Sequence, residues 1–184
     1  MIKRILFATM LLLAAFVSKA QPVVSGSFGL TTITEKFDGD KQVQTFGFNI
    51  TPSVGYVFGD WEFGLIFEYS HNKIKRHTNN TTETDAYYAV GPYANYCFAN
   101  VGKLYFSAEA YSMLGFADGE HSVDIQLLPV ATYEINDRWD IDFYSDILSV
   151  NYQWTKTDDD ITTSQLNILS NYGKLFGIGF TYKF

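Results

Sequence analysis

Hydrophobic and polar residues alternate with a period of two along most of the chain. From residue 46 to 58 the even positions carry Phe, Phe, Ile, Pro, Val, Tyr and Phe, whereas the odd positions carry Gly, Asn, Thr, Ser, Gly and Val. After a Gly59-Asp60 turn, the odd positions from 61 to 69 carry Trp, Phe, Leu, Phe and Tyr. Successive side chains of a strand point to opposite faces, so this pattern predicts strands with one bulky apolar face and one small, polar or acidic face.

The same alternation recurs often enough to predict eight strands. The expected strands lie near residues 23–34, 46–58, 61–70, 87–98, 104–111, 123–134, 139–144 and 165–184. Pro52, Pro92 and Pro129 fall inside them, and because proline cannot donate to a β-ladder we expect a bulge at each. Lys174 breaks the apolar parity of the last strand and suggests another bulge.

The connections between these strands differ in length. Those near 59–60, 99–103 and 136–138 are tight, whereas those at 36–42, 72–84 and 155–163 are longer and polar, with 118–121 as a short exception. An even number of strands with short turns at one rim and longer loops at the other is typical of an outer-membrane barrel whose termini are periplasmic. The sequence therefore predicts an all-β fold, an eight-stranded antiparallel up-and-down transmembrane β-barrel.

The first 20 residues have the organisation of a cleaved secretory signal peptide. Lys3 and Arg4 precede an apolar stretch from Ile5 to Val17, and Ser18-Lys19-Ala20 provides a small-x-small cleavage site. We therefore expect residues 1–20 to be removed and residues 21–184 to form one barrel domain. No later apolar run approaches the roughly 20 residues of a transmembrane helix.

The bulky face of the strands is expected to meet lipid. Aromatic residues lie beside the tight turns and the C-terminus, and others lie towards the opposite rim, as in the two aromatic girdles of membrane barrels. The acidic residues share the other face with Gly and Ser, which is the reverse of a soluble barrel. We expect an integral protein of the bacterial outer membrane, in contact with lipopolysaccharide and phospholipid.

Three stretches carry a family resemblance: ITPSVGYVFGDWEFGLIFEYS, PYANYCF with the following LYFSAEAY, and the terminal FGIGFTYKF. They resemble the small outer-membrane β-barrel family that includes OmpX-type proteins and the transmembrane domain of OmpA. The resemblance rests on strand–turn–strand rhythm and covers residues 21–184. It implies that Phe184, with aromatic residues at alternate preceding positions, is recognised by the outer-membrane assembly machinery.

The predicted lumen carries many acidic side chains and few basic ones. The acids are Glu62, Glu68, Glu109, Asp124, Glu134, Asp140, Asp142 and Asp146, and only Lys183 clearly shares their face. Eight strands leave an interior just wide enough for side chains, which disfavours a wide pore. We expect a hydrated polar network, and the alternative is a cation site or a narrow cation path.

No catalytic, cofactor-binding or metal-binding motif is present, so none of these sites is predicted. The alternative of a lipid-modifying enzyme at the outer rim would use residues such as Ser70, His71, His77 and Glu83. His121 and the acidic run 158–160 are expected to be solvated. A non-enzymatic structural or surface-interaction role through the outer loops is therefore favoured, with an accessory subunit of a larger outer-membrane complex as a further alternative.

The net charge argues against nucleic acid as a binding partner, and the cysteine content excludes an intramolecular disulfide. The 184-residue chain has 13 basic and 20 acidic residues, and removal of Lys3, Arg4 and Lys19 leaves 10 basic against 20 acidic residues. A chain this acidic lacks the basic surface that nucleic acids require. Cys97 is the single cysteine, so no intramolecular disulfide forms. We expect a monomer whose outer loops bind a protein partner.

Overall fold

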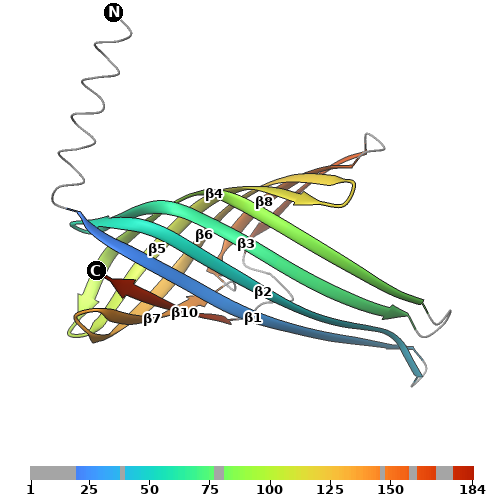
Figure 1. The fold of residues 1–184 in the computed structure, drawn as a ribbon, viewed down its shortest axis with the longest axis horizontal. Helices are drawn as coiled ribbons and strands as arrows, with labels where there is room; N and C mark the ends of the chain where they lie inside the picture. The colour runs from blue at the N-terminus through green and yellow to red at the C-terminus, as the bar shows by residue number, and fades with distance from the viewer. Residues whose placement is uncertain (1–19, 38–39, 77–80, 146–147, 158–160, 169–175) are drawn as a thin grey trace, which may run out of the picture.

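The computed structural model describes residues 20–37, 40–76, 81–145, 148–157, 161–168 and 176–184, and they form β-strands almost throughout (Figure 1). The strands, in chain order, are β1 (Gln21–Phe37), β2 (Asp40–Phe58), β3 (Trp61–Arg76), β4 (Thr81–Val101), β5 (Leu104–Ala117), β6 (Glu120–Asn136), β7 (Trp139–Ser145), β8 (Val150–Thr157), β9 (Thr162–Ile168) and β10 (Phe176–Lys183). The predicted signal peptide and Lys174 lie outside the described residues.

These ten strands fill eight positions of one closed antiparallel barrel. Residues 130–136 of β6 pair with β7, and residues 120–127 pair with β8, so β7 and β8 are two parts of the seventh strand. β10 pairs with β7 and β9 pairs with β8, so they form the eighth strand. β10 also pairs with β1, which closes the barrel and confirms the predicted architecture.

The barrel closes where the two ends of the 21–184 segment meet. The β1–β10 register runs from Val23 opposite Lys183 to Phe28 opposite Ile178. Beyond it, the Phe184 backbone N–H donates to the carbonyl oxygen of Pro22 at 3.1 Å. The edge of the C-terminal strand is thus covered by β1, and only its outer apolar face needs another environment.

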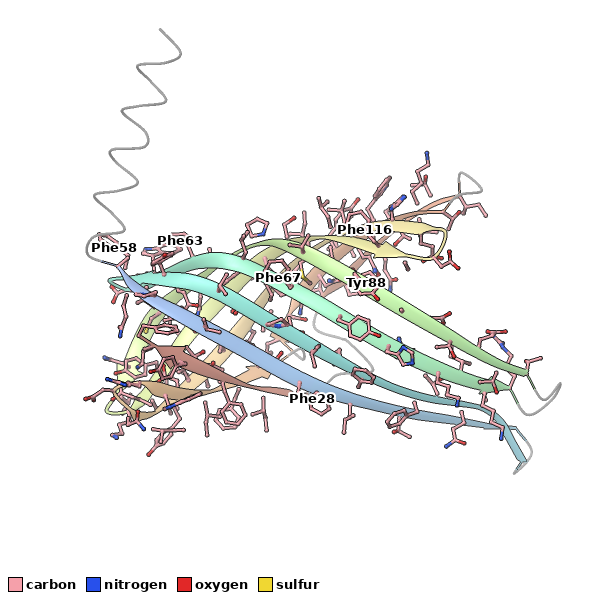
Figure 2. The ribbon with its side chains drawn as sticks, in the orientation of Figure 1. Phe28, Phe58, Phe63, Phe67, Tyr88 and Phe116 are labelled. Atoms are coloured by element: carbon pink, nitrogen blue, oxygen red, sulfur yellow. The ribbon has the colours of Figure 1, made fainter. Side chains whose placement is uncertain are left out.

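Bulky apolar side chains form a belt on the outside of the barrel. Leu65 and Phe67 of β3 are 48% and 42% exposed, whereas Ile66 between them is 8% exposed. Figure 2 shows Phe28, Phe63, Phe67 and Tyr88 on the outer surface. The belt also includes Val54, Leu114, Ile125, Phe143 and Phe180. Exposure of so continuous an apolar surface to water would be energetically unfavourable. The belt therefore marks the part of the barrel that spans lipid.

The two ends of the barrel differ. The turn end carries the Gly59-Asp60, Gly102-Lys103 and Asp137-Arg138 turns. The opposite end is called the loop end, and there the predicted loop 72–84 is wrong in extent: β3 continues to Arg76 and β4 begins at Thr81. Its Thr, Lys and Glu residues are polar on both faces, so the alternation disappears although the backbone ladder continues.

At other connections, too, the strands are longer than the sequence predicted. The expected connection at 99–103 is mostly strand, because β4 runs to Val101 and a register shift between Cys97 and Ala99 absorbs an extra residue. β1 and β2 likewise extend into the predicted 36–42 loop, and β8 and β9 extend into the predicted 155–163 loop. Polar strand ends therefore account for most of the difference between the predicted and observed connections.

The expectation of a bulge at each proline is wrong for Pro52 and Pro92, whereas at Pro129 the register of β6 with its partner strand does shift. Pro52 keeps its place opposite Gly26 of β1, and the β2–β3 register is the same on either side of it, although residues 51 and 52 have no partner in β3. Pro92 likewise stays opposite Leu65, while residues 91 and 92 have no partner in β5. The missing N–H is accommodated by a local gap in one ladder, so the strand needs no extra residue.

The outward direction of Phe67 can be tested by substitution. Phe67→Arg should lower the free energy of unfolding by about 2–4 kcal/mol in lipid vesicles if this position faces the bilayer midplane. Thr84→Arg, in the polar end of β4, is the matched control and should change it little, because that position is exposed beyond the apolar belt. Urea titration of both variants measures the difference, and equal losses would contradict the assigned membrane position.

Candidate functional sites in the lumen and at the loop end

At the turn end of the lumen, the ammonium group of Lys183 contacts two acidic side chains. Lys183 of β10 places its ammonium 3.0 Å from Asp140 Oδ1 and 3.8 Å from Glu134 Oε2, and all three side chains are largely buried. The Tyr105 hydroxyl donates to Glu134 Oε2 at 3.1 Å. Lys183 therefore holds two carboxylates, one from the adjacent β7 and one from β6 on the far side of β7. The sequence pattern placed these three side chains in the lumen but did not pair them.

The next acidic residues are stabilised by hydroxyl groups. Asp142 accepts hydrogen bonds from Thr132 at 2.6 Å and from Thr181 at 2.7 Å. Glu62 accepts one from the Tyr93 hydroxyl. Threonine and tyrosine on strands that neighbour the acids thus replace the missing bases, which agrees with the expected polar network.

An apolar layer lies above this network, towards the loop end. Ile66, Ala89, Tyr93 and Met113 pack together, with Tyr87 and Tyr111 against them, and Met113 is only 2% exposed. These side chains occupy the lumen at this level, which argues against an open cation path. The periodicity placed Ile66, Ala89 and Tyr93 inside, whereas Met113 lies beyond the strand predicted at 104–111. Their packing could not be predicted, because inward apolar residues are few and scattered in sequence.

Polar pairs return closer to the loop end. Ser70 donates to Glu68 at 2.7 Å, and the hydroxyls of Tyr87 and Ser122 lie 3.3 Å apart. The Asn151 amide donates to Asp124. Glu68 and Asp124 are therefore satisfied locally, and Asp146 lies outside the described residues.

Among the described rim residues, Ser70, His71 and Glu83 do not come together as a lipid-modifying enzyme would need. Ser70 faces the lumen, whereas the His71 ring packs on the outer face against Phe48 with 5.6 Å between centroids. Glu83 forms an exposed ion pair with Arg76 at 3.2 Å. His77 lies outside the described residues, and His121 packs at the edge of the Phe116 ring.

Aromatic side chains gather near both limits of the apolar belt. At the turn end Trp61 packs on Tyr96, Trp139 packs on Tyr182, and Tyr182 meets Phe184 at 4.8 Å between ring centroids. Towards the loop end the rings of Tyr69 and Tyr88 lie 5.0 Å apart. Amphipathic rings favour membrane–water interfaces, so these groups mark the two boundaries of the bilayer.

Two kinds of feature are absent from the described part of the chain. No group of three or more His, Cys, Asp or Glu side chains there is arranged to hold a metal ion. No helix there is long and apolar enough to cross a membrane.

Comparison with known proteins identifies the fold. No family model and no curated protein matches the chain. Among solved structures it is similar to the outer-membrane protein OprG of Pseudomonas aeruginosa, with a TM-score of 0.52 and 13% identity over 90% of this chain and 96% of that one. Neisserial surface protein A gives a TM-score of 0.47 and 17% identity over 89% of this chain and 97% of that one.

The fold and the lipid-facing belt define the class. This is a transmembrane β-barrel of the small outer-membrane type, with eight strand positions and a filled lumen. The OprG likeness supports the OmpX-like fold that the strand rhythm indicated.

The Lys183 cluster allows a matched test of the lumen. Lys183→Met should lower the free energy of unfolding by about 3–5 kcal/mol, because it leaves Asp140 and Glu134 buried without their cation. Arg76→Met breaks the exposed Arg76–Glu83 pair and should cost about 0–1 kcal/mol. Urea unfolding of both variants at neutral pH measures the contrast, and a small loss for Lys183→Met would show that the two acids do not depend on it.

Proposed function

We propose that this protein is an integral outer-membrane barrel with a non-enzymatic role, in which a sheet at the loop end binds an extended strand of a partner protein. The proposal rests on one observation: the β1–β2 and β3–β4 hairpins extend beyond their neighbours and leave a strand edge without a described partner. Figure 1 shows these two hairpins continuing together away from the barrel.

The register defines that edge. β3 and β4 pair out to Arg76 opposite Thr81, whereas the β4–β5 pairing begins only at Tyr87 opposite Ala117. The chain turns at Asp118-Gly119 directly afterwards. Residues 82–86 of β4 therefore have no described strand on the β5 side. Five residues span about 17 Å, which is enough for a partner strand of ordinary length.

Residues 82–86 have the composition of an edge that can accept another strand. Residues 82–85 are exposed, contain no proline, and include Thr82 and Thr84, which favour extended backbone. A free edge presents backbone N–H and C=O groups in a row, and many proteins bind extended segments through such edges. The surrounding polar side chains keep the edge in water, where it stays accessible.

We further propose that the outer-membrane assembly machinery recognises the terminal strand, that the protein is a monomer, and that it has no catalytic activity. Phe180, Tyr182 and Phe184 alternate along the lipid-facing side of the terminal strand, which supports recognition of this segment by the outer-membrane assembly machinery. Closure of the barrel within one chain supports a monomer. The separation of Ser70, His71 and Glu83 supports a role without catalysis.

The proposal is tested by site-specific photo-cross-linking in living cells. A cross-linking residue at Thr82 should give a discrete protein adduct, and Thr84→Lys should lower its yield severalfold because a lysine on an edge disfavours strand addition. Asp118→Lys, at the β5–β6 turn, is the matched control and should leave the yield unchanged.

The same experiment separates the alternatives. Adducts at the lipid-facing Phe63 but not at Thr82 would instead support an accessory subunit packed within a larger membrane complex. Absence of adducts at both positions, with altered phospholipid or lipopolysaccharide in cells that express the protein, would support the enzyme alternative and contradict the proposal.

A further inference from the structure

Two buried side-chain oxygen atoms without a hydrogen-bond partner, Asn95 Oδ1 and Ser107 Oγ, lie on adjacent strands in the lumen; a third, Asp140 Oδ1, faces the Lys183 ammonium at 3.0 Å. Glu109 of β5 is 8% exposed, and the charged groups that act on it are the carboxylates of Glu62 and Asp142, with no described basic side chain among them. Ser107 lies two residues before it on the same face, is 4% exposed, and its Oγ has no partner. Asn95 of β4 lies directly opposite Glu109, and its buried Oδ1 also lacks a partner.

A second carboxylate completes this row. Glu62 of β3 lies directly opposite Asn95, so Glu62, Asn95 and Glu109 are consecutive cross-strand neighbours on β3, β4 and β5. Directly opposed residues have Cβ atoms about 5 Å apart, so both glutamate side chains are long enough to meet over the shorter asparagine. The Tyr93 hydroxyl donates to Glu62 Oε1 and thereby holds that carboxylate in place.

Three other luminal acids, Asp140, Glu134 and Asp142, have partners of their own. Lys183 holds Asp140 and Glu134, and two threonine hydroxyls donate to Asp142. Lys183 is thus already engaged at another level. A buried carboxylate without a donor or counterion is expensive, and the unpartnered Asn95 and Ser107 oxygens add to the cost. A bound cation would neutralise the charge and coordinate all of these oxygens together.

We propose that Glu62, Asn95, Ser107 and Glu109 form a luminal binding site for one hard divalent cation, with Ca²⁺ as the preferred ion. Two carboxylates balance its charge, and the amide and hydroxyl oxygens are neutral ligands of the kind that Ca²⁺ accepts in irregular geometry. Mg²⁺ demands a near-ideal octahedron, which a row of side chains across three strands does not supply. The Cys97 thiol, opposite Ser107, donates instead to the Ala99 carbonyl oxygen at 3.6 Å.

The site has a structural consequence for the barrel. It joins β3, β4 and β5 on the side of the lumen that lies below the layer of Ile66, Ala89 and Met113. That layer separates the site from the loop end, so ions are expected to enter from the turn end. Binding should therefore stabilise the barrel against unfolding, since the unfolded chain does not bring these four residues together.

The test is Ca²⁺ binding to the protein folded in detergent micelles, measured by calorimetry and by urea unfolding in Ca²⁺ and in EDTA. The native protein should bind one luminal Ca²⁺ and unfold at higher urea concentration with it. Glu109→Gln should weaken binding at least about tenfold, because one of two charged ligands is lost. Glu68→Gln is the matched control, since Glu68 also faces the lumen but accepts a hydrogen bond from Ser70.

Ser107→Ala separates a ligand from a merely structural side chain. In EDTA it should leave stability unchanged or raised, because it removes a buried hydroxyl without a partner, whereas in Ca²⁺ it should weaken binding. No Ca²⁺ binding by the native protein would overturn the proposal. Equal binding by the native protein and Glu109→Gln, or by the native protein and Ser107→Ala, would also overturn it. Binding of Zn²⁺ in place of Ca²⁺, lost in Cys97→Ala, would overturn the assigned ion class.

Discussion

Backbone N–H and C=O groups at bilayer depth must find partners inside the protein, because hydrocarbon offers none and each unpaired group costs several kcal/mol. The whole architecture depends on this constraint. It requires the first strand and the last to meet, and the ladder between β1 and β10 does so, ending in the bond from Phe184 to Pro22. It also explains why the apolar belt can stay on the outside: once the backbone is satisfied by closure, the side chains are free to face lipid.

The same constraint gives the prolines their positions. Pro129 of β6 keeps its partner Ala108 on β5, and on its other side the pairing passes from β8 at Leu127 to β7 at Val130. The residue without an N–H therefore sits where the seventh strand divides into two parts. Pro52 and Pro92 differ from Pro129, because each sits at a gap in one ladder across which the register is unchanged. Across Pro129 the register shifts, from Leu127 opposite Val150 to Val130 opposite Tyr144.

Much of this fold could be predicted from sequence because its dominant signal is local. The alternation around Phe67 reports the direction of each side chain, and the Gly59-Asp60 turn reports where a strand reverses. The polar strand ends at 72–76 and 81–84 could not be separated from loops, since outside the bilayer both faces are polar and no alternation remains. The luminal partners were also out of reach, because Lys183 and Glu134 meet only through barrel closure. Glu109 was identified as an inward acid, but its lack of a donor depends on how neighbouring strands share their hydroxyl groups.

The limits of the bilayer also explain where a free strand edge can exist. A strand edge without a partner is costly beside lipid but tolerable in water, so residues 82–86 of β4 can lack a partner on the β5 side only beyond the membrane surface. The aromatic pair Tyr69 and Tyr88 lies just before this edge and marks that surface. From Tyr87 towards the turn end, β4 has β5 as a partner, and on the other side of that point its exposed side chains are polar. The pairing pattern and the side-chain pattern therefore change at the same place along β4. This coincidence is expected if the barrel is built to satisfy its backbone within lipid and to offer the same backbone groups to another protein outside it.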